Sequence, residues 1–391
     1  MRDLIFKTLR DFALSYWEQQ SFFGPADVAI IGAGLVGLTA ALYLKERRPG
    51  WRIVVLERGA LPAGASTKNA GFACFGSVSE LIEQEQRGDL QAVVAARWEG
   101  LRRLRALVGD DALDYRPVGG YELFRAGADD ALAADCLARM AHFNALLAPI
   151  IGPAAIFRSA PEMARRAGLG GIQAVIENTQ EGSLDAGRMM RTLLARAWAA
   201  DVPVLTGCAV TALETPAAGP VRLHLANGIA LEADQALLAT NAFATELLPA
   251  LPVVPGRGQV LVTEPLPGRC LPGTFHYDRG YTYFRQLPDH RILLGGGRHL
   301  NFAAEATTAP GLTAPVQEYL ENLLCEAITP GLRPRIDYRW SGVMGFGPAL
   351  APVLDWVQPG VLAAVRCNGM GVALGAGLGW QAAEKLAPAA R

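Results

Sequence analysis

The sequence has few of the features that mark secreted, metal-binding or nucleic-acid-binding proteins. Its six cysteines are separated by long gaps, which gives neither a close-spaced zinc pattern nor a redox pair. The formal net charge is only -1 and charged residues make up 19% of the chain, so nucleic acid is not an expected partner. We predict no metal site, and we expect a globular protein in a reducing, cytoplasmic setting.

Long apolar runs are also missing. The longest, from Val28 to Leu44, is interrupted by three glycines, and the first 20 residues mix charges with apolar residues at helical spacing. The first pattern does not fit a membrane span and the second does not fit a secretory signal. With 391 residues, of which 51% are hydrophobic, the chain is long enough for two packed domains.

What is present near the N-terminus is one βαβ unit. Residues 27–31 form a short β-branched run that stops at Gly32, as a buried parallel strand does. A helix is predicted over 35–48, where apolar residues recur every three or four positions before Pro49 and Gly50 end it. Residues 52–56 then predict a second strand.

The remainder predicts two domains that alternate along the chain. Residues 78–166 are mostly helical with a strand at 120–124, and a helix follows over 183–200. Strands are expected at 202–214, 221–225, 229–232 and 236–240, and alternating polar and apolar runs at 258–264, 280–286 and 291–295 predict an antiparallel sheet. A strand, a glycine-rich turn and a helix close the chain over 361–385. We assign residues 1–85, 167–245 and 341–391 to a dinucleotide domain, and 86–166 and 246–340 to a substrate or cap domain.

The turn after the first strand carries the pattern G-x-G-x-x-G. It comprises Gly32, Ala33, Gly34, Leu35, Val36 and Gly37, placed directly between strand and helix. The second glycine lets a pyrophosphate approach the backbone, and the helix N-terminus offers free N–H groups to it. Glu57 ends the second strand about 20 residues later, where an acidic residue binds the adenosine ribose. This arrangement predicts a dinucleotide site but does not separate flavin from nicotinamide.

Two further glycine-rich segments carry a resemblance to a known family. Residues 64–71 (GASTKNAG) resemble the flavin-approach loop of the D-amino-acid oxidase superfamily of FAD enzymes, among which glycine oxidase and gamma-glutamylputrescine oxidase are similar. Residues 339–342 (RWSG), 367–372 (CNGMGV) and 375–377 (GAG) resemble that family's last W-x-G strand, flavin turn and final helix.

The resemblance implies an α/β fold in which a Rossmann-type FAD-binding domain is interleaved with an α+β substrate domain built on an antiparallel sheet. It implies non-covalent FAD and an enzyme that oxidises the C–N bond of a small amine or amino acid by hydride transfer to flavin N5. Besides the first glycine loop and Glu57, the FAD-binding residues expected are Arg58, Ser66, Thr67, Lys68, Asn69, Ala70, Gly71, Val210, Thr240, Asn241, Gly369, Met370, Gly371 and Val372.

Candidate substrate residues are polar side chains in the predicted antiparallel sheet: Gln259, Tyr281, Tyr283, Arg285, Arg298 and His299. Each also has a structural interpretation, as a salt bridge or as a core residue with a satisfied hydrogen bond. Similar family members hold the substrate carboxylate with an arginine soon after the W-x-G element, and here the matching position is Met344. We therefore expect an amine, or an amino acid held by another arginine such as Arg285 or Arg298.

Several alternatives remain open at this point. The same fold family includes 2-hydroxy-acid dehydrogenases, and a binding or assembly subunit could retain FAD as a structural ligand. Cys74, close to the flavin loop, could attach the flavin covalently, although a buried free cysteine is the more common finding. Lys68 could stand near the flavin as a cation. The sequence does not choose between oxygen and a quinone as electron acceptor, and it does not determine the oligomeric state.

Overall fold

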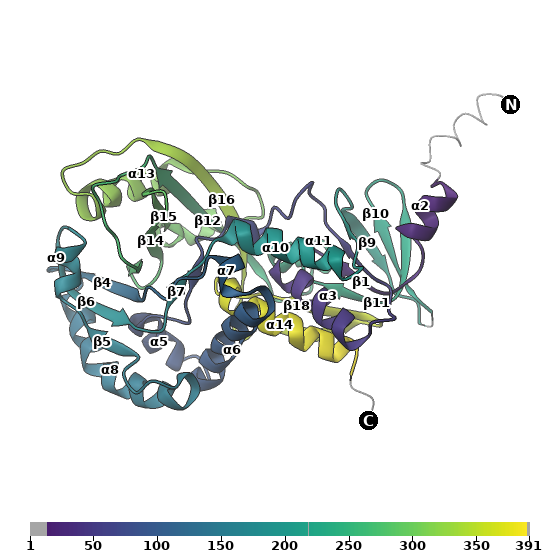
Figure 1. Ribbon diagram of the computed structural model, residues 1–391, viewed down its shortest axis with the longest axis horizontal. Coiled ribbons are helices and arrows are strands. Elements are labelled where there is room, and N and C mark those ends of the chain that lie inside the picture. The colour runs from purple at the N-terminus through teal and green to yellow at the C-terminus, as the bar shows by residue number, and fades with distance from the viewer. Residues whose placement is uncertain (1–13, 218, 389–391) are drawn as a thin grey trace.

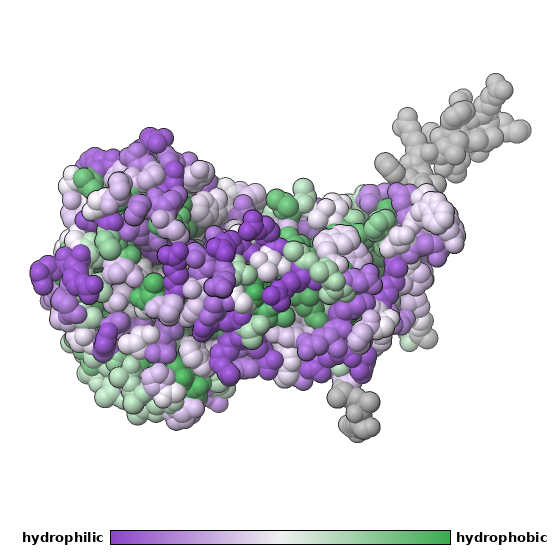
Figure 2. Space-filling view, in the orientation of Figure 1, coloured by the Kyte–Doolittle hydropathy of each residue, from purple (hydrophilic) through white to green (hydrophobic). Residues whose placement is uncertain are grey.

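The computed structural model describes residues 14–217 and 219–388, which form two lobes side by side (Figure 1). Each lobe contains one eight-stranded sheet. Residues 1–13, which include most of the predicted N-terminal helix, lie outside the described part. Within that part, no helix combines the length and the apolar character that crossing a bilayer requires. The surface over the 22-residue helix α8 (Asp130–Ile151) is partly hydrophobic (Figure 2). The charged residues Asp130, Asp135 and Arg139 interrupt the apolar sequence of this helix.

The first sheet has the strand order β17-β18-β11-β1-β2-β8, with β10 and β9 continuing from β11. Its members are β1 (Ala26–Ile31), β2 (Ile53–Leu56), β8 (Val204–Leu205), β9 (Val210–Glu214), β10 (Val221–Leu225), β11 (Ala230–Leu238), β17 (Val353–Gln358) and β18 (Val361–Val365). Strands β18, β11, β1, β2 and β8 run parallel. This confirms the predicted parallel βαβ unit, with β1, α3 (Leu35–Arg47) and β2 within a residue or two of the expected limits.

The second sheet has the order β16-β12-β15-β14-β13-β4-β6-β5. Its members are β4 (Gly120–Arg125), β5 (Phe157–Ser159), β6 (Ile172–Asn178), β12 (Val254–Thr263), β13 (Thr274–Tyr277), β14 (Thr282–Gln286), β15 (Ile292–Gly296) and β16 (Ile336–Phe346). The predicted antiparallel pairing holds except between β13 and β4, which run parallel. The two strands come from segments about 150 residues apart, so no local turn forces them to be antiparallel.

The remaining elements are helices and one two-stranded sheet. The helices are α2 (Tyr16–Ser21), α4 (Ala65–Lys68), α5 (Val78–Glu85), α6 (Leu90–Val108), α7 (Asp110–Leu113), α9 (Glu162–Arg166), α10 (Ala186–Ala199), α11 (Ala244–Leu247), α12 (Phe302–Glu305), α13 (Ala314–Leu323) and α14 (Gly371–Leu386). Short helical turns are η1 (Asn241–Phe243), η2 (Arg298–Leu300) and η3 (Leu324–Ile328), and β3 (Phe72–Ala73) pairs with β7 (Gly182–Ser183).

Several expected boundaries were wrong. The predicted strands at 229–232 and 236–240 are one strand, β11, which pairs with β10 over residues 230–233 and with β1 over residues 233–238. The strand expected over 202–214 is divided into β8 and β9. Strand β6 and residues 341–346 of β16 belong to the second sheet, although ranges 167–245 and 341–391 were assigned to the dinucleotide domain. In both cases hydrogen-bonded partners distant in sequence, β4 and β12, determine the sheet.

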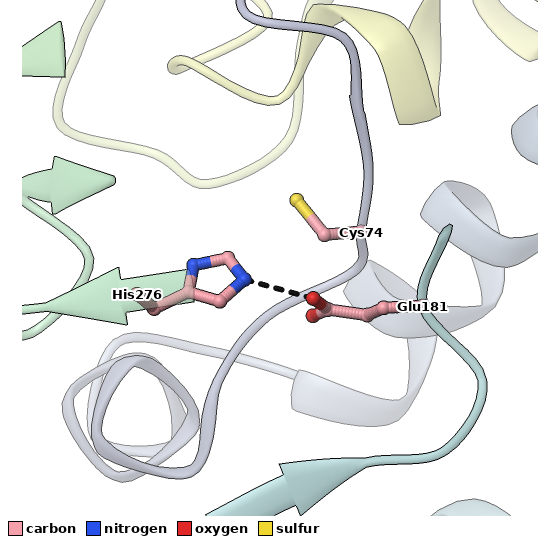
Figure 3. Close-up of side chains that lie close together, drawn as sticks. All are labelled: Cys74, Glu181 and His276. Carbon is pink, nitrogen blue, oxygen red and sulfur yellow. Dashed lines mark hydrogen bonds and ion pairs between the residues drawn. The ribbon is translucent and has the colours of Figure 1, made fainter. Parts of the chain in front are cut away.

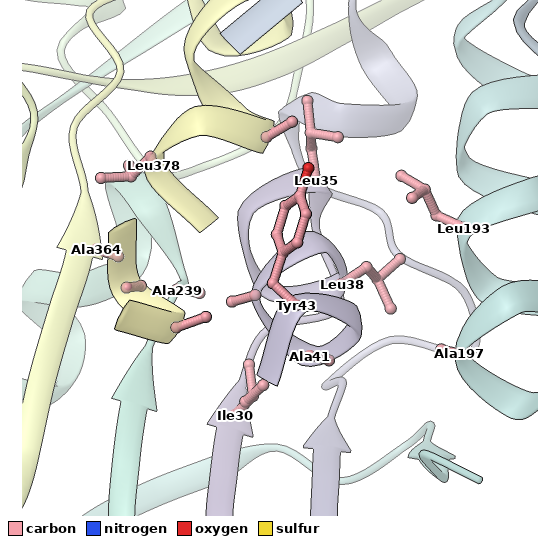
Figure 4. Packing of buried hydrophobic residues seen from close by; sticks show 14 of the residues in the cluster. Ile30, Leu35, Leu38, Ala41, Tyr43, Leu193, Ala197, Ala239, Ala364 and Leu378 are labelled. Atoms are coloured by element: carbon pink, nitrogen blue, oxygen red, sulfur yellow. The ribbon is translucent and has the colours of Figure 1, made fainter. Parts of the chain in front are cut away.

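The core of the first lobe holds the phosphate helix α3 against its neighbours. Leu38, Ala41 and Tyr43 of α3 pack with Leu193 and Ala197 of α10 and with residues from β1, β18 and α14 (Figure 4). Small residues allow α14 to approach closely: a Cβ on Gly379 would lie 2.2 Å from Thr39 Oγ1. Helix α6 also packs closely against α14 at Gly100, where a Cβ would lie 2.0 Å from the carbonyl oxygen of Ala373. This packing brings the N-termini of α3 and α14 to one pocket.

Candidate active site

A pocket of about 810 Å³ lies between the two lobes. The ends of β1, β2, β11 and β18 and the N-termini of α3 and α14 line one side of it, and the second sheet lines the other. Parallel α/β sheets bind ligands at the carboxyl ends of their strands, where loops and helix N-termini converge. The pocket is therefore in the place where a dinucleotide is expected.

The first glycine loop has the geometry that close phosphate approach requires. Gly32 has φ +105°, and a Cβ there would lie 2.9 Å from the carbonyl oxygen of Ala239. A Cβ on Gly37 would lie 2.0 Å from the carbonyl oxygen of Gly32, so glycine is needed for α3 to sit against the loop. At Gly34, by contrast, a Cβ would meet only Ser66 Oγ, at 3.1 Å, and this residue lines the pocket. The space in front of Gly34 is thus left for a ligand.

Polar groups around the same end also fit an adenine dinucleotide. Glu57 is buried, and its carboxylate accepts hydrogen bonds from the backbone N–H groups of Ala33, at 3.1 Å, and Gly59, at 3.0 Å. It faces the pocket, where its remaining lone pairs can accept ribose hydroxyls. Thr240 Oγ1 is a buried hydroxyl in the pocket wall with no partner among the described residues. An unsatisfied buried hydroxyl calls for a ligand or water.

Most of the expected cofactor residues line this pocket. They are Gly32, Gly34, Leu35, Val36, Glu57, Arg58, Ser66, Lys68, Asn69, Ala70, Val210, Thr240, Asn241, Gly369, Met370, Gly371 and Val372. Ala33, Gly37, Thr67 and Gly71 do not line it: they shape the two loops from behind. Contact of each of these residues with FAD remains a prediction.

The second sheet presents a row of side chains to the pocket. Backbone pairing aligns Val260 on β12, Gly295 on β15, Tyr283 on β14 and His276 on β13, so these residues share one face. The Tyr283 ring occupies the space beside Gly295, where a side chain would otherwise stand: a Cβ on Gly295 would lie 2.6 Å from that ring. Burial raises the pKa of Tyr283 to about 12, so its hydroxyl is a hydrogen-bond donor at neutral pH.

Of the two predicted substrate arginines, Arg298 is the one that lines the pocket and the one that the structure leaves available. Its guanidinium lies 3.8 Å from the centre of the Phe346 ring and 4.9 Å from that of Phe302, and it lines the pocket. Among the described residues, no carboxylate or carbonyl oxygen accepts a hydrogen bond from it. Burial lowers the pKa of this guanidinium, which still remains charged at neutral pH. Met344, at the position of the expected clamp, also lines the pocket.

Three other predicted substrate residues are placed elsewhere. Arg285 is buried and donates from Nε to the carbonyl oxygen of Ala70, at 2.7 Å, and from Nη2 to that of Leu184, at 2.9 Å. Gln259 bonds with Glu305, Thr313 and Gln317 behind the sheet. His299 Nε2 pairs with Asp278 at 2.8 Å. None of the three lines the pocket. Strand alternation turns Gln259 away from the pocket, because its neighbour Val260 faces it. Local partners hold the other two: the carbonyl oxygens of Ala70 and Leu184 engage Arg285, and Asp278 engages His299 in the turn η2.

The structure also brings together a polar cluster that the sequence did not reveal. Cys74, Glu181 and His276 meet beside the pocket, and their sulfur, oxygen and nitrogen atoms lie within 4.8 Å of one another (Figure 3). Burial and the nearby carboxylates of Glu181 and Glu80 raise the pKa of the Cys74 thiol well above its usual range. A protonated thiol is a poor nucleophile, which argues against the covalent flavin link considered for Cys74. The three residues come from segments far apart in the sequence, so no local pattern marked them as a cluster.

A family model described as FAD dependent oxidoreductase, DAO, matches residues 27–385 of the chain. A curated relative, the tRNA 5-methylaminomethyl-2-thiouridine biosynthesis bifunctional protein MnmC of Paracidovorax citrulli, is 32% identical over 250 residues, 61% of this chain and 35% of that protein. Thiamine thiazole synthase of Schizosaccharomyces pombe is 37% identical over 51 residues, 13% of this chain and 16% of that one. The matches thus span about a third or less of these curated relatives.

Solved structures share the fold over nearly the whole chain. L-proline dehydrogenase from P. horikoshii superposes with a TM-score of 0.72 at 16% identity, covering 93% of each chain. Glycine oxidase from Geobacillus kaustophilus superposes with a TM-score of 0.70 at 20% identity, covering 93% of this chain and 94% of that one. L-alpha-glycerophosphate oxidase from Mycoplasma pneumoniae, with FAD bound, gives 0.73 at 13% identity and covers 93% and 95%. These likenesses confirm the predicted fold class.

Proposed function

Because the chain belongs to the DAO family of FAD dependent oxidoreductases, we propose that it oxidises the C–N bond of a small amino acid whose carboxylate is held by Arg298. Bound FAD supplies the acceptor for the two electrons that leave the substrate. The chain itself binds and orients both molecules and excludes water from the reacting carbon.

One observation carries the choice of an amino acid: Arg298, which has no acidic partner among the described residues, faces the pocket beside Met344, the position where the family's carboxylate-binding arginine was expected. A Cβ on Gly256 would lie 3.5 Å from Arg298 Nη1, and Gly256 pairs with Met344 across β12 and β16. The Arg298 guanidinium therefore lies beside the strand on which the family's substrate-binding arginine was expected, although Arg298 itself belongs to η2, the turn after β15. A guanidinium binds a carboxylate through two parallel hydrogen bonds, which fixes the orientation of the substrate.

The aromatic surroundings of Arg298 favour this role over a structural one. The ring centres of Phe346, Phe302 and Tyr281 lie 3.8, 4.9 and 5.9 Å from the guanidinium carbon, so its surroundings are aromatic and not acidic. The Tyr283 hydroxyl also has no hydrogen-bond partner among the described side chains and faces the same pocket. Together they offer a positively charged, partly dehydrated place for one carboxylate.

The test is anaerobic reduction of the bound flavin by matched substrates. Amino acids, their decarboxylated amines and the corresponding 2-hydroxy acids are mixed with the wild type and with Arg298→Met, and flavin absorbance is followed. Losing charge-assisted hydrogen bonds costs about 1.5–3 kcal/mol, so the variant weakens amino-acid binding about 10- to 150-fold. Decarboxylated amines, lacking the group in question, are affected little.

The matched control is Arg279→Met. Arg279 lines the rim of the same pocket, but it is half exposed and pairs with Glu83 at 3.4 Å, so we expect little change. Equal losses for amino acids and amines in Arg298→Met would contradict the carboxylate role. Bleaching by hydroxy acids but not amino acids would support the 2-hydroxy-acid dehydrogenase alternative. If no compound bleached the flavin, a binding or assembly role would be favoured.

A further inference from the structure

The His276–Glu181 pair is a buried, prearranged group at the substrate side of the pocket. His276 lies on β13, Glu181 in the turn before β7 and Cys74 just after β3, and the three converge in Figure 3. His276 Nε2 lies 2.8 Å from Glu181 Oε2. His276 is 6% exposed and lines the pocket, and its second ring nitrogen, Nδ1, has no hydrogen-bond partner among the described residues. One end of the imidazole is therefore fixed, and the other end is free.

The backbone makes room for this pair. A Cβ on Gly120 of β4 would lie 1.8 Å from Glu181 Oε2, so only glycine leaves space for the carboxylate. Asn178 holds the other oxygen, with Nδ2 to Oε1 at 3.2 Å. Replacing a buried ion pair by packed apolar residues is often neutral or stabilising, so stability alone is a weak reason for this arrangement. Positioning of the free Nδ1 is a better one.

The charges around His276 determine what it can bind. Burial by itself lowers the pKa of His276, but Glu181, with further contributions from Glu80 and Glu122, outweighs burial and raises the pKa to about 9. The ring is then an imidazolium with an N–H at Nδ1. Of the other groups near the cluster, Cys74 and Tyr283 stay protonated at neutral pH, because burial raises the pKa of each. The cation Arg97 is occupied by the carbonyl oxygen of Phe75 and by Gln84.

We propose that the free Nδ1 of His276, held in place by Glu181, forms a hydrogen bond with an amide in the side chain of the substrate, so that the enzyme acts on amino acids bearing an amide. A primary amide offers an acceptor oxygen and two donor N–H groups, so it can pair with Nδ1 in either protonation state of the ring. A second carboxylate would approach the buried carboxylate of Glu181, which already contacts the imidazole, and like charges repel strongly in a buried site. A neutral amide pairs with Nδ1 without that repulsion.

The inference rests on the proposed function, since the carboxylate of the same substrate is placed at Arg298. The guanidinium lies beside β12 and β16, whereas His276 is on β13, three strand spacings or about 14 Å from β12. Both side chains reach into the space between, with Tyr283 on the intervening strand β14. The substrate is therefore extended, with its two polar ends separated.

The test uses acids that cannot be oxidised at a C–N bond next to the carboxylate. Succinamate, glutaramate and adipamate carry a terminal amide, and each is compared with the dicarboxylate and the alkanoate of the same chain length. Binding to the FAD-loaded protein is measured by calorimetry, independently of turnover. At the chain length that spans the two anchors, one net hydrogen bond makes the amide bind about 3- to 10-fold more tightly than the alkanoate. The dicarboxylate binds more weakly than the amide.

The variant is the double substitution His276→Phe with Glu181→Gln, which removes the donor without leaving a buried carboxylate unpaired. It loses the amide preference while the alkanoate binds as before. If it does not fold, as judged by thermal denaturation and flavin absorbance, Glu181→Gln alone reduces the preference by weakening the charge on the imidazole. Because Cys74, Glu181 and His276 could together ligate a metal, elemental analysis accompanies the assay.

The outcomes separate the two proposals. If acids of every kind fail to bind, the carboxylate site at Arg298 is wrong and this inference falls with it. If the acids bind but amides show no preference at any length, or if the double variant keeps the preference, only the role of His276 is wrong. Tighter binding of a dicarboxylate, or stoichiometric zinc in the purified protein, would also overturn it.

Discussion

Substituting glycines one at a time by alanine separates what the phosphate loop does for the fold from what it does for FAD. At Gly37 the new methyl group would lie 2.0 Å from the carbonyl oxygen of Gly32, which is rigid backbone. Helix α3 must then move away from the loop, and overpacking of this kind costs about 1–3 kcal/mol. We expect Gly37→Ala to lower both the free energy of unfolding and the affinity for FAD.

At Gly34 the same change has a different consequence. The methyl group would meet only Ser66 Oγ, at 3.1 Å, so the protein without FAD should keep nearly wild-type stability. The methyl group instead occupies the place of a phosphate oxygen. Loss of charge-assisted hydrogen bonds from the loop costs about 1.5–3 kcal/mol, which raises the Kd for FAD about 10- to 150-fold. The control is Gly50→Ala, where a Cβ meets nothing within 4 Å.

Two measurements distinguish the three variants. Urea denaturation of the apoprotein gives the free energy of unfolding, and quenching of flavin fluorescence on titration gives the Kd. The expected pattern is loss of both in Gly37→Ala, loss of affinity alone in Gly34→Ala and neither in Gly50→Ala. Wild-type affinity for FAD in Gly34→Ala would refute the placement of the pyrophosphate at this loop.

The remaining predictions concern the second lobe. Arg285→Met should lower the melting temperature, because two buried carbonyl oxygens lose their donor at about 1–3 kcal/mol each; an unchanged melting temperature with lost substrate binding would restore Arg285 as a substrate residue. Since burial holds the pKa of Cys74 high, acid precipitation should leave the flavin in the supernatant, and a yellow pellet would show the opposite. The pKa of His276 is raised from 6.5 to about 9, so its stabilising contribution is complete below pH 6.5 and is lost as pH rises through 9. Urea denaturation at both pH values should show this loss in the wild type, and a loss of the same size in the His276→Phe/Glu181→Gln variant would contradict it.

The dinucleotide half of the site could be predicted because its determinants are local. A strand, a glycine turn and a helix follow one another within about 20 residues, and Gly37 is required by the carbonyl oxygen of Gly32 in the same turn. Strand β1, helix α3 and strand β2 therefore appear in the sequence almost as they appear in the structure. The same holds for the segment around Gly371, where a helix N-terminus follows a buried strand.

The substrate half depended on tertiary structure. Arg285 lies near the end of β14 and Arg298 in the turn η2 just after β15, and nothing in their local sequence says which of them faces the pocket. Two carbonyl oxygens from residues 70 and 184 engage the first, whereas an aromatic enclosure from distant segments leaves the second available. His276 was missed because its partner, Glu181, is 95 residues away and reaches it only through the space at Gly120.

The sequence by itself thus determined the nucleotide-binding βαβ unit, because this unit rests on short-range spacing of glycine, acidic and apolar residues. Its other glycine-rich segments carried the resemblance that implied the α/β fold class and the family. Which strands join which sheet, and which polar side chains face the pocket, was decided only when segments far apart in the chain paired. A side chain in a strand points to one of two faces, and the partner across the sheet determines whether that face is a pocket, a core or a hydrogen-bonded network.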